Sequence, residues 1–126
     1  MTPIQKIQHL IINLAFEFKG ETAPPVAEDN VEDLYDEIME EDEGYDAKME
    51  IREGIVKTGQ TCYDSRHYES ESVAAQAVDG TWVGWTYWSG GGKHGEPEEM
   101  EWMGDAYNLD CKEEEKMTVH RTFTKI

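Results

Sequence analysis

The sequence predicts an α+β fold. It is expected to form one domain, with two N-terminal helices, a mainly antiparallel sheet of about four strands and one helix between the later strands. Apolar residues recur at helical spacing near the N-terminus, strand-like alternation starts at Ala47, and Asp79-Gly80 separates two extended runs. The 126 residues suit a single domain, in which 1–46 form an acidic helical part and 47–126 a strand-rich body.

The first helix is predicted to begin after Thr2 and to end before Gly20. Thr2 is a suitable N-cap, Pro3 fits the first turn, Gln5 completes a capping box, and Gly20 is a C-terminal stop. The residues of its apolar face are Ile4, Ile7, Ile11, Leu14 and Phe18, widened by Ile12, Ala15 and Phe16. This face is expected to pack on the core; a helix that dimerises or binds a partner is the alternative.

The second predicted helix is strongly acidic. It follows a linker at Glu21–Asp29, begins at Asn30 and is ended by Gly44, with a narrow apolar stripe of Val31, Leu34, Ile38 and Met39. From Gly20 to Ala47 there are twelve acidic residues and no Lys or Arg. Like charges stand four residues apart, which destabilises an isolated helix, at Glu32/Asp36, Asp36/Glu40 and Glu37/Glu41. The helix therefore needs packing, a cation or a partner to offset this repulsion.

Alternation from Ala47 to Ile55 predicts a strand, since Met49, Ile51 and Ile55 alternate with polar residues. Gly59-Gln60 is expected to be a turn. The polar segment Thr61–Ser72 is expected to be an edge strand.

Asp79-Gly80 predicts a β-hairpin between Val73–Val78 and Thr81–Trp88. A two-residue turn would pair Val78 with Thr81, Ala77 with Trp82 and Ala75 with Gly84. One face would then carry Val73, Ala75, Ala77, Trp82, Gly84, Thr86 and Trp88, with Trp85 and Tyr87 on the other. Small residues between large ones permit the close approach of a helix or a ligand.

A third helix is predicted to start at Pro97, with apolar spacing at Met100, Met103, Ala106 and Tyr107. An acidic turn at Glu113–Glu115 then leads into a final strand that carries Met117, Val119, Phe123 and Ile126.

The net charge of −17 restricts the partners that the chain can bind. It arises from 28 acidic and 11 basic residues, and it argues against binding of nucleic acid or anionic membranes, which requires clustered Lys and Arg. This charge is compatible with binding to a basic protein surface or to a divalent cation, or with a role only in keeping the protein soluble. The cysteines Cys62 and Cys111 lack metal-site spacing and are expected to be reduced thiols in a cytoplasmic protein. No secretory signal, membrane span, resident metal or cofactor is predicted.

The most unusual composition lies in Trp82–Pro97, where an aromatic strand runs into a Gly-Gly-Gly-Lys-His loop. Candidate ligand-binding residues are Trp85, Tyr87, Lys93, His94 and Glu96, and a connector with a packed strand is the alternative interpretation. The loop lacks phosphate-loop spacing, and His94-Gly95-Glu96 lacks the cysteine half of a zinc deaminase motif. No credible set of nucleophile, base and orienting residue can be placed, which favours a binding role over catalysis.

The sequence of this same region is similar to a segment found in other proteins. G-W-x-Y-W-x-G-G-G-K-H-G-E-P followed by E-W-M-x-D-A-Y, from Gly84 to Tyr107, resembles a segment of small uncharacterised acidic proteins encoded by bacteriophages and prophages. The resemblance covers about a fifth of the chain and implies a phage or prophage origin without a biochemical activity.

Together these observations favour an acidic module that binds another protein. In one version it is an inhibitor whose carboxylates occupy a basic or nucleic-acid-binding surface, as a row of phosphates would. The candidate partner-binding residues are Asp33, Asp36, Glu37, Glu40, Glu41 and Glu43. A small-molecule binder or small enzyme built on the aromatic strand and Gly-rich loop is the alternative, and a homo-oligomeric structural module is the third possibility.

Overall fold

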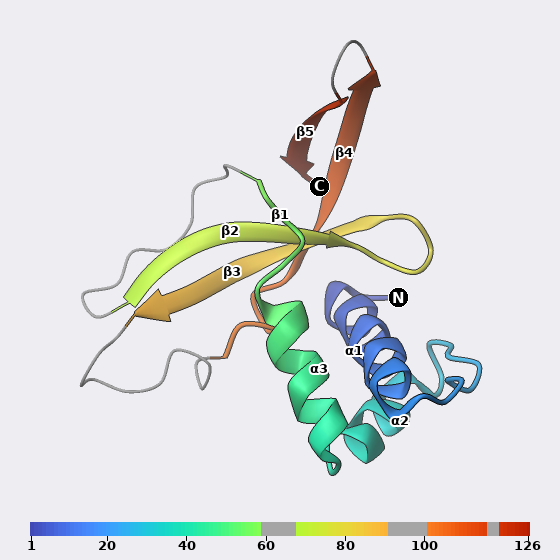
Figure 1. Ribbon diagram of the computed structural model, residues 1–126. Coiled ribbons are helices and arrows are strands. Elements are labelled where there is room, and N and C mark those ends of the chain that lie inside the picture. The colour runs from blue at the N-terminus through green and yellow to red at the C-terminus, as the bar shows by residue number, and fades with distance from the viewer. Residues whose placement is uncertain (59–67, 91–100, 116–118) are drawn as a thin grey trace.

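The computed structural model describes residues 1–58, 68–90, 101–115 and 119–126. Its elements are α1 (Pro3–Lys19), α2 (Val31–Ile38), α3 (Asp42–Arg52), β1 (Val56–Lys57), β2 (Tyr68–Gln76), β3 (Trp82–Gly90), β4 (Tyr107–Glu115) and β5 (Val119–Lys125). The strands form one antiparallel sheet in the order β1-β2-β3-β4-β5. The helices gather on one side of the β2–β3 hairpin, and the β4–β5 hairpin extends away from them (Figure 1). The predicted α+β class with a mainly antiparallel sheet is confirmed. In detail, the described residues form five strands rather than about four, and three helices rather than two precede the first strand.

Helix α1 follows its sequence signals closely. The hydroxyl of Thr2 accepts a hydrogen bond from the Gln5 backbone N–H, and the Gln5 side chain accepts one from the Thr2 N–H. Gly20 ends the helix in the left-handed conformation, with a φ of 71°. The predicted face is buried in its middle and open at its ends: Ile7, Ile11, Ile12 and Ala15 are fully buried, whereas Ile4 and Phe18 are exposed.

The single acidic helix predicted up to Gly44 is wrong, because two helices occupy this region. Helix α2 stops at Ile38, the chain turns, and α3 begins at Asp42 with Gly44 inside it. Packing explains the break: a Cβ atom at Gly44 would lie 2.0 Å from the Ile38 carbonyl oxygen. Gly44 therefore permits the end of α2 to rest against the first turn of α3, rather than ending a helix.

The strand predicted at Ala47–Ile55 is also wrong, because α3 continues to Arg52. Gly44, Ala47 and Arg52 are buried, at a spacing of three and five residues that places them toward one side of a helix. Ile55 is 69% exposed, so it does not complete the apolar alternation that suggested a strand. Four or five alternating residues are too few to distinguish the two-residue period of a strand from the roughly 3.6-residue period of a helix.

The predicted hairpin exists, but its register is shifted by one residue. Val78, Asp79 and Gly80 form a three-residue loop, closed by a 2.7 Å hydrogen bond from the Ala77 N–H to the Thr81 carbonyl. Gly80 has a φ of 91°, the positive value that such a loop needs at its last position. As a result Gln76 pairs with Trp82, and Ala74, rather than Ala75, pairs with Gly84.

This shift moves the small residues to different faces of the sheet. Val73, Ala75, Val83 and Trp85 join the core beneath the helices. Ala74 packs instead with Leu109 and Phe123, and Trp82 and Tyr107 lie against that second cluster. A Cβ atom at Gly84 would lie 2.7 Å from Leu109 Cδ1, so the predicted close approach at Gly84 is made by strand β4.

The later elements differ from the prediction in two places. Residues 101–106 of the predicted third helix form no helix, and Tyr107 begins β4; Pro97–Met100 lie outside the described residues. Glu113–Glu115, predicted as a turn, are the end of β4 and pair with β5. The predicted edge strand overlaps β2 from Tyr68, and β1 lies outside it in the sheet.

Replacing Gly44 with alanine is expected to destabilise the protein by about 1–3 kcal/mol, because the new methyl group meets a backbone carbonyl that cannot move alone. Helix propensity alone predicts the opposite sign, a gain of about 1 kcal/mol. Urea unfolding distinguishes the two. Gly104→Ala is the matched control, since its Cβ would meet nothing closer than 3.7 Å.

The hairpin turn predicts a pH dependence of stability. Hydrogen bonds from the Thr81 hydroxyl and then the Thr81 backbone N–H lower the pKa of Asp79 below its usual 3.8. The folded state thus favours the charged carboxylate, and this stabilisation is present above pH 3.8 and lost as the pH falls through the folded pKa. Asp79→Asn should unfold at a lower urea concentration than the wild type near pH 7. Convergence of the two midpoints in acid is expected, and a constant difference would contradict the charge assignment.

Candidate functional site

Five of the six predicted partner-binding carboxylates are exposed. Asp33, Asp36 and Glu37 lie on α2, Glu40 and Glu41 lie in the turn that follows, and the half-buried Glu43 lies at the start of α3. Buried Val31 and Ile38 and half-buried Leu34 anchor α2 to the body of the protein. The break after Ile38 changes the predicted repulsion. Of the three acidic pairs predicted, Glu32/Asp36 lies within α2, whereas the other two include Glu40 or Glu41, which lie beyond its end.

A groove lies where these carboxylates meet the C-terminal end of α1. It has a volume of about 290 Å³. Its apolar lining residues are Phe16, Leu34 and Ile38, and its charged ones are Glu37, Glu40, Glu41 and Lys19. We call this feature the acidic groove. It combines apolar surface with three carboxylates, which is a suitable environment for a long side chain with a cationic end.

Lys19 already shows how a cation binds here. Its Nζ lies 3.1 Å and 3.2 Å from the two Glu41 carboxylate oxygens, 3.3 Å from Glu21 and 4.9 Å from the centre of the Phe16 ring. The hydrogen bond to Glu41, followed by that to Glu21, raises the pKa of Lys19. Within the described parts of the chain, Glu37 and Glu40 form no ion pair. Two of the three groove carboxylates are therefore available to a second cation.

Of the five predicted ligand-binding residues, the structure describes Trp85 and Tyr87. Trp85 is fully buried; its indole N–H donates a 2.8 Å hydrogen bond to the Arg52 carbonyl, and its ring lies 5.3 Å from that of Trp102. A side chain with no exposed surface has none to offer a ligand. Tyr87 is half-buried, and Lys93, His94 and Glu96 lie outside the described residues.

Arg52 is a structural residue that the sequence did not single out. Its Nη1 donates a 2.7 Å hydrogen bond to the Trp88 carbonyl, and its guanidinium lies 4.7 Å from the Tyr87 ring centre. The residue is only 9% exposed and joins the last turn of α3 to β3. A cation is favourable at a helix C-terminus, a signal that was hidden because this segment was predicted to be a strand.

Lys6 is a second buried cation that sequence reasoning missed. It is 8% exposed and donates a 2.8 Å hydrogen bond to the side-chain oxygen of Asn108. No local signal could have found this contact, because its two residues are 102 positions apart.

Neither a metal-binding cluster nor a spanning helix is present in the described ranges. No three His, Cys, Asp or Glu side chains converge there so as to hold a metal ion. None of the helices found there has the length and apolarity needed to cross a membrane.

Comparison with known proteins adds no relative: the chain matches no protein-family model, no curated protein and no solved structure. The resemblance to phage-encoded proteins therefore stays an expectation.

The structural role of Trp85 predicts that Trp85→Phe destabilises the protein by about 1–3 kcal/mol. The change leaves the buried Arg52 carbonyl without its donor and opens a small cavity. Tyr87→Phe is the control, because it keeps the ring beneath the Arg52 guanidinium; we expect a change within about 0.5 kcal/mol. Equal urea midpoints for wild type and Trp85→Phe would contradict the assignment of Trp85 to the core.

Proposed function

We propose that this chain is a protein-binding module that captures a basic segment of another protein in the acidic groove. The observation that supports the proposal most is the composition of the groove: apolar Phe16, Leu34 and Ile38 beside carboxylates of which Glu37 and Glu40 have no cation in the described structure. Neither an apolar patch nor an acidic patch alone would select a basic amphipathic segment, whereas this combination does.

In this proposal an arginine or lysine side chain of the partner lays its methylene groups along the apolar lining. Its cationic end reaches Glu37 and Glu40, beside the position that Lys19 takes at Glu41. The net charge of −17 attracts a basic partner from a distance and accelerates association. The exposed acids outside the groove, such as Asp33 and Asp36, contribute to this steering.

An inhibitory role is the most concrete form of the proposal. A basic surface that binds nucleic acid offers both the positive charge and the long side chains that the groove accepts. Occupation of such a surface by the carboxylates of α2 and the following turn would exclude the nucleic acid. The alternative function, a small-molecule binder built on the aromatic strand, is weakened because Trp85 is buried and its ring cannot stack on a ligand.

The test compares two triple variants that remove the same number of charges. Glu37→Gln, Glu40→Gln and Glu41→Gln change the groove, whereas Glu32→Gln, Asp46→Asn and Glu50→Gln change exposed acids that do not line it. The probe is a synthetic peptide that alternates arginine with leucine, titrated by calorimetry at constant salt. We expect the groove variant to bind about tenfold more weakly, or about 1.4 kcal/mol, and the control variant to change much less.

Two further comparisons make the result specific. The same peptide with citrulline in place of arginine keeps the shape and removes the charge, so it should bind weakly to every variant. Lys19→Met removes the cation that Glu41 already binds and should tighten binding of the arginine peptide. Equal losses in the two triple variants would show that only net charge matters, and the groove proposal would then fail.

A further inference from the structure

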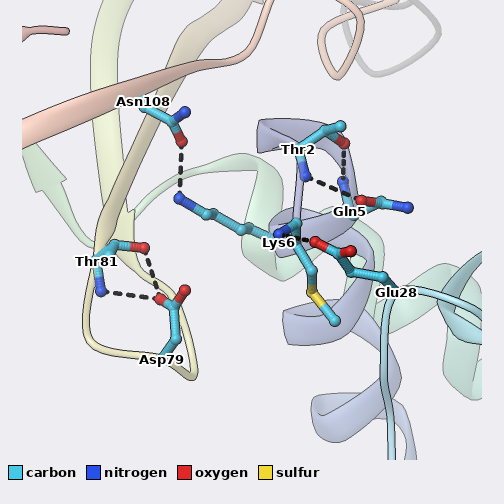
Figure 2. Close-up of polar contacts among 8 residues, drawn as sticks. Thr2, Gln5, Lys6, Glu28, Asp79, Thr81 and Asn108 are labelled. Carbon is cyan, nitrogen blue, oxygen red and sulfur yellow. Dashed lines mark hydrogen bonds and ion pairs between the residues drawn. The ribbon is translucent and has the colours of Figure 1, made fainter.

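A second hollow lies at the other end of α1, between the β2–β3 turn and strand β4. Its volume is about 620 Å³, within the range of about 300–1,000 Å³ that small-molecule sites occupy. Residues from four separate segments line it, among them Lys6, Gln76, Thr81, Trp82, Asn108 and Leu109. We call this hollow the Lys6 pocket. Figure 2 shows Lys6 reaching from α1 toward Asn108, with Thr81 and Asp79 beside it.

We propose that the Lys6 pocket binds a small molecule that carries a carboxylate group. Lys6 is more than nine-tenths buried, yet its ammonium group donates its described hydrogen bond to a neutral amide oxygen. Among the described residues, no carboxylate lies within ion-pair distance of Lys6 Nζ. A buried charge is costly unless a counter-charge compensates it, and an anionic group in the pocket would supply that counter-charge.

The neighbouring acids limit the kind of anion that fits. The charge of Lys6 contributes to lowering the pKa of Asp79, after the larger effects of the Thr81 hydrogen bonds, so Asp79 gives Lys6 partial compensation at longer range. Its carboxylate is held by the Thr81 hydroxyl at 2.5 Å and by the Thr81 N–H at 2.9 Å. Asp110 also lines the pocket. Two nearby negative charges disfavour a dianionic phosphate more than a monoanionic carboxylate.

The remaining lining suits the rest of such a ligand. Because the Asn108 side-chain oxygen accepts from Lys6, its amide N–H groups remain as donors for a second carboxylate oxygen. Half-buried Trp82 also lines the pocket and offers apolar contact for a planar body. The inferred ligand is therefore a monocarboxylate with a flat apolar part.

Benzoate and benzamide are matched probes, because they share a ring and differ in charge. In a titration followed by NMR up to about 10 mM, we expect benzoate to shift the Thr81, Leu109 and Trp82 indole N–H signals of the full chain, and benzamide to leave them nearly unchanged. Absence of benzoate-dependent shifts, or equal shifts with both probes, would overturn the proposal.

Two variants test the role of the buried charge. Lys6→Met removes it and should weaken benzoate binding about tenfold or more. Asn108→Asp keeps the shape but supplies an internal carboxylate to Lys6, so it should abolish benzoate binding while the protein stays folded, even if Lys6→Met fails to fold. Benzoate binding that persists in Asn108→Asp would overturn the proposal. The acidic-groove triple variant should bind benzoate as the wild type does, which separates this inference from the proposed function.

Discussion

Burial of one face of α1 is the interaction on which the rest of the structure depends. This helix contacts α2, α3, β3 and β4, so it joins the helical part to the sheet. Ile7, Ile11 and Ile12 are fully buried on it, each contributing about 1.5–3 kcal/mol of favourable burial. This apolar surface has to outweigh the mutual repulsion in a chain of net charge −17, in which the described ion pairs are few and mostly exposed.

The same helix supplies one cation to each of the two candidate binding sites. Lys19, in its last turn, binds Glu41 at the acidic groove, while Lys6, in its second turn, lies buried at the pocket formed by the sheet. The two cations differ in what surrounds them. Lys19 has more carboxylates near it than it can neutralise, whereas Lys6 has a neutral amide as its hydrogen-bond acceptor. One end of α1 is therefore suited to a basic ligand and the other to an acidic one.

Prediction from the sequence succeeded where a signal acts within one helical turn. It failed where the structure depends on the packing of one backbone segment against another or on the length of a loop. The capping box and Gly20 defined α1 because each acts within one helical turn. The break between α2 and α3 depends on the contact of Gly44 with the Ile38 carbonyl, which composition does not reveal. The hairpin register depended on whether the loop contains two or three residues, and Asp79-Gly80 is compatible with both. The acidic residues of the groove were predicted, but its apolar lining and the Lys6 pocket required the tertiary structure.

Apolar burial holds the fold together against carboxylates that remain largely unneutralised. Stability as a function of modest salt tests this most directly, because raising sodium chloride from about 10 to about 150 mM shortens the screening length from about 30 to about 8 Å. Screening weakens repulsion among exposed carboxylates, so the account predicts that the urea midpoint rises over this range. A midpoint that falls would show that ion pairs stabilise the fold, and it would contradict both the account and the availability of the groove carboxylates to a partner.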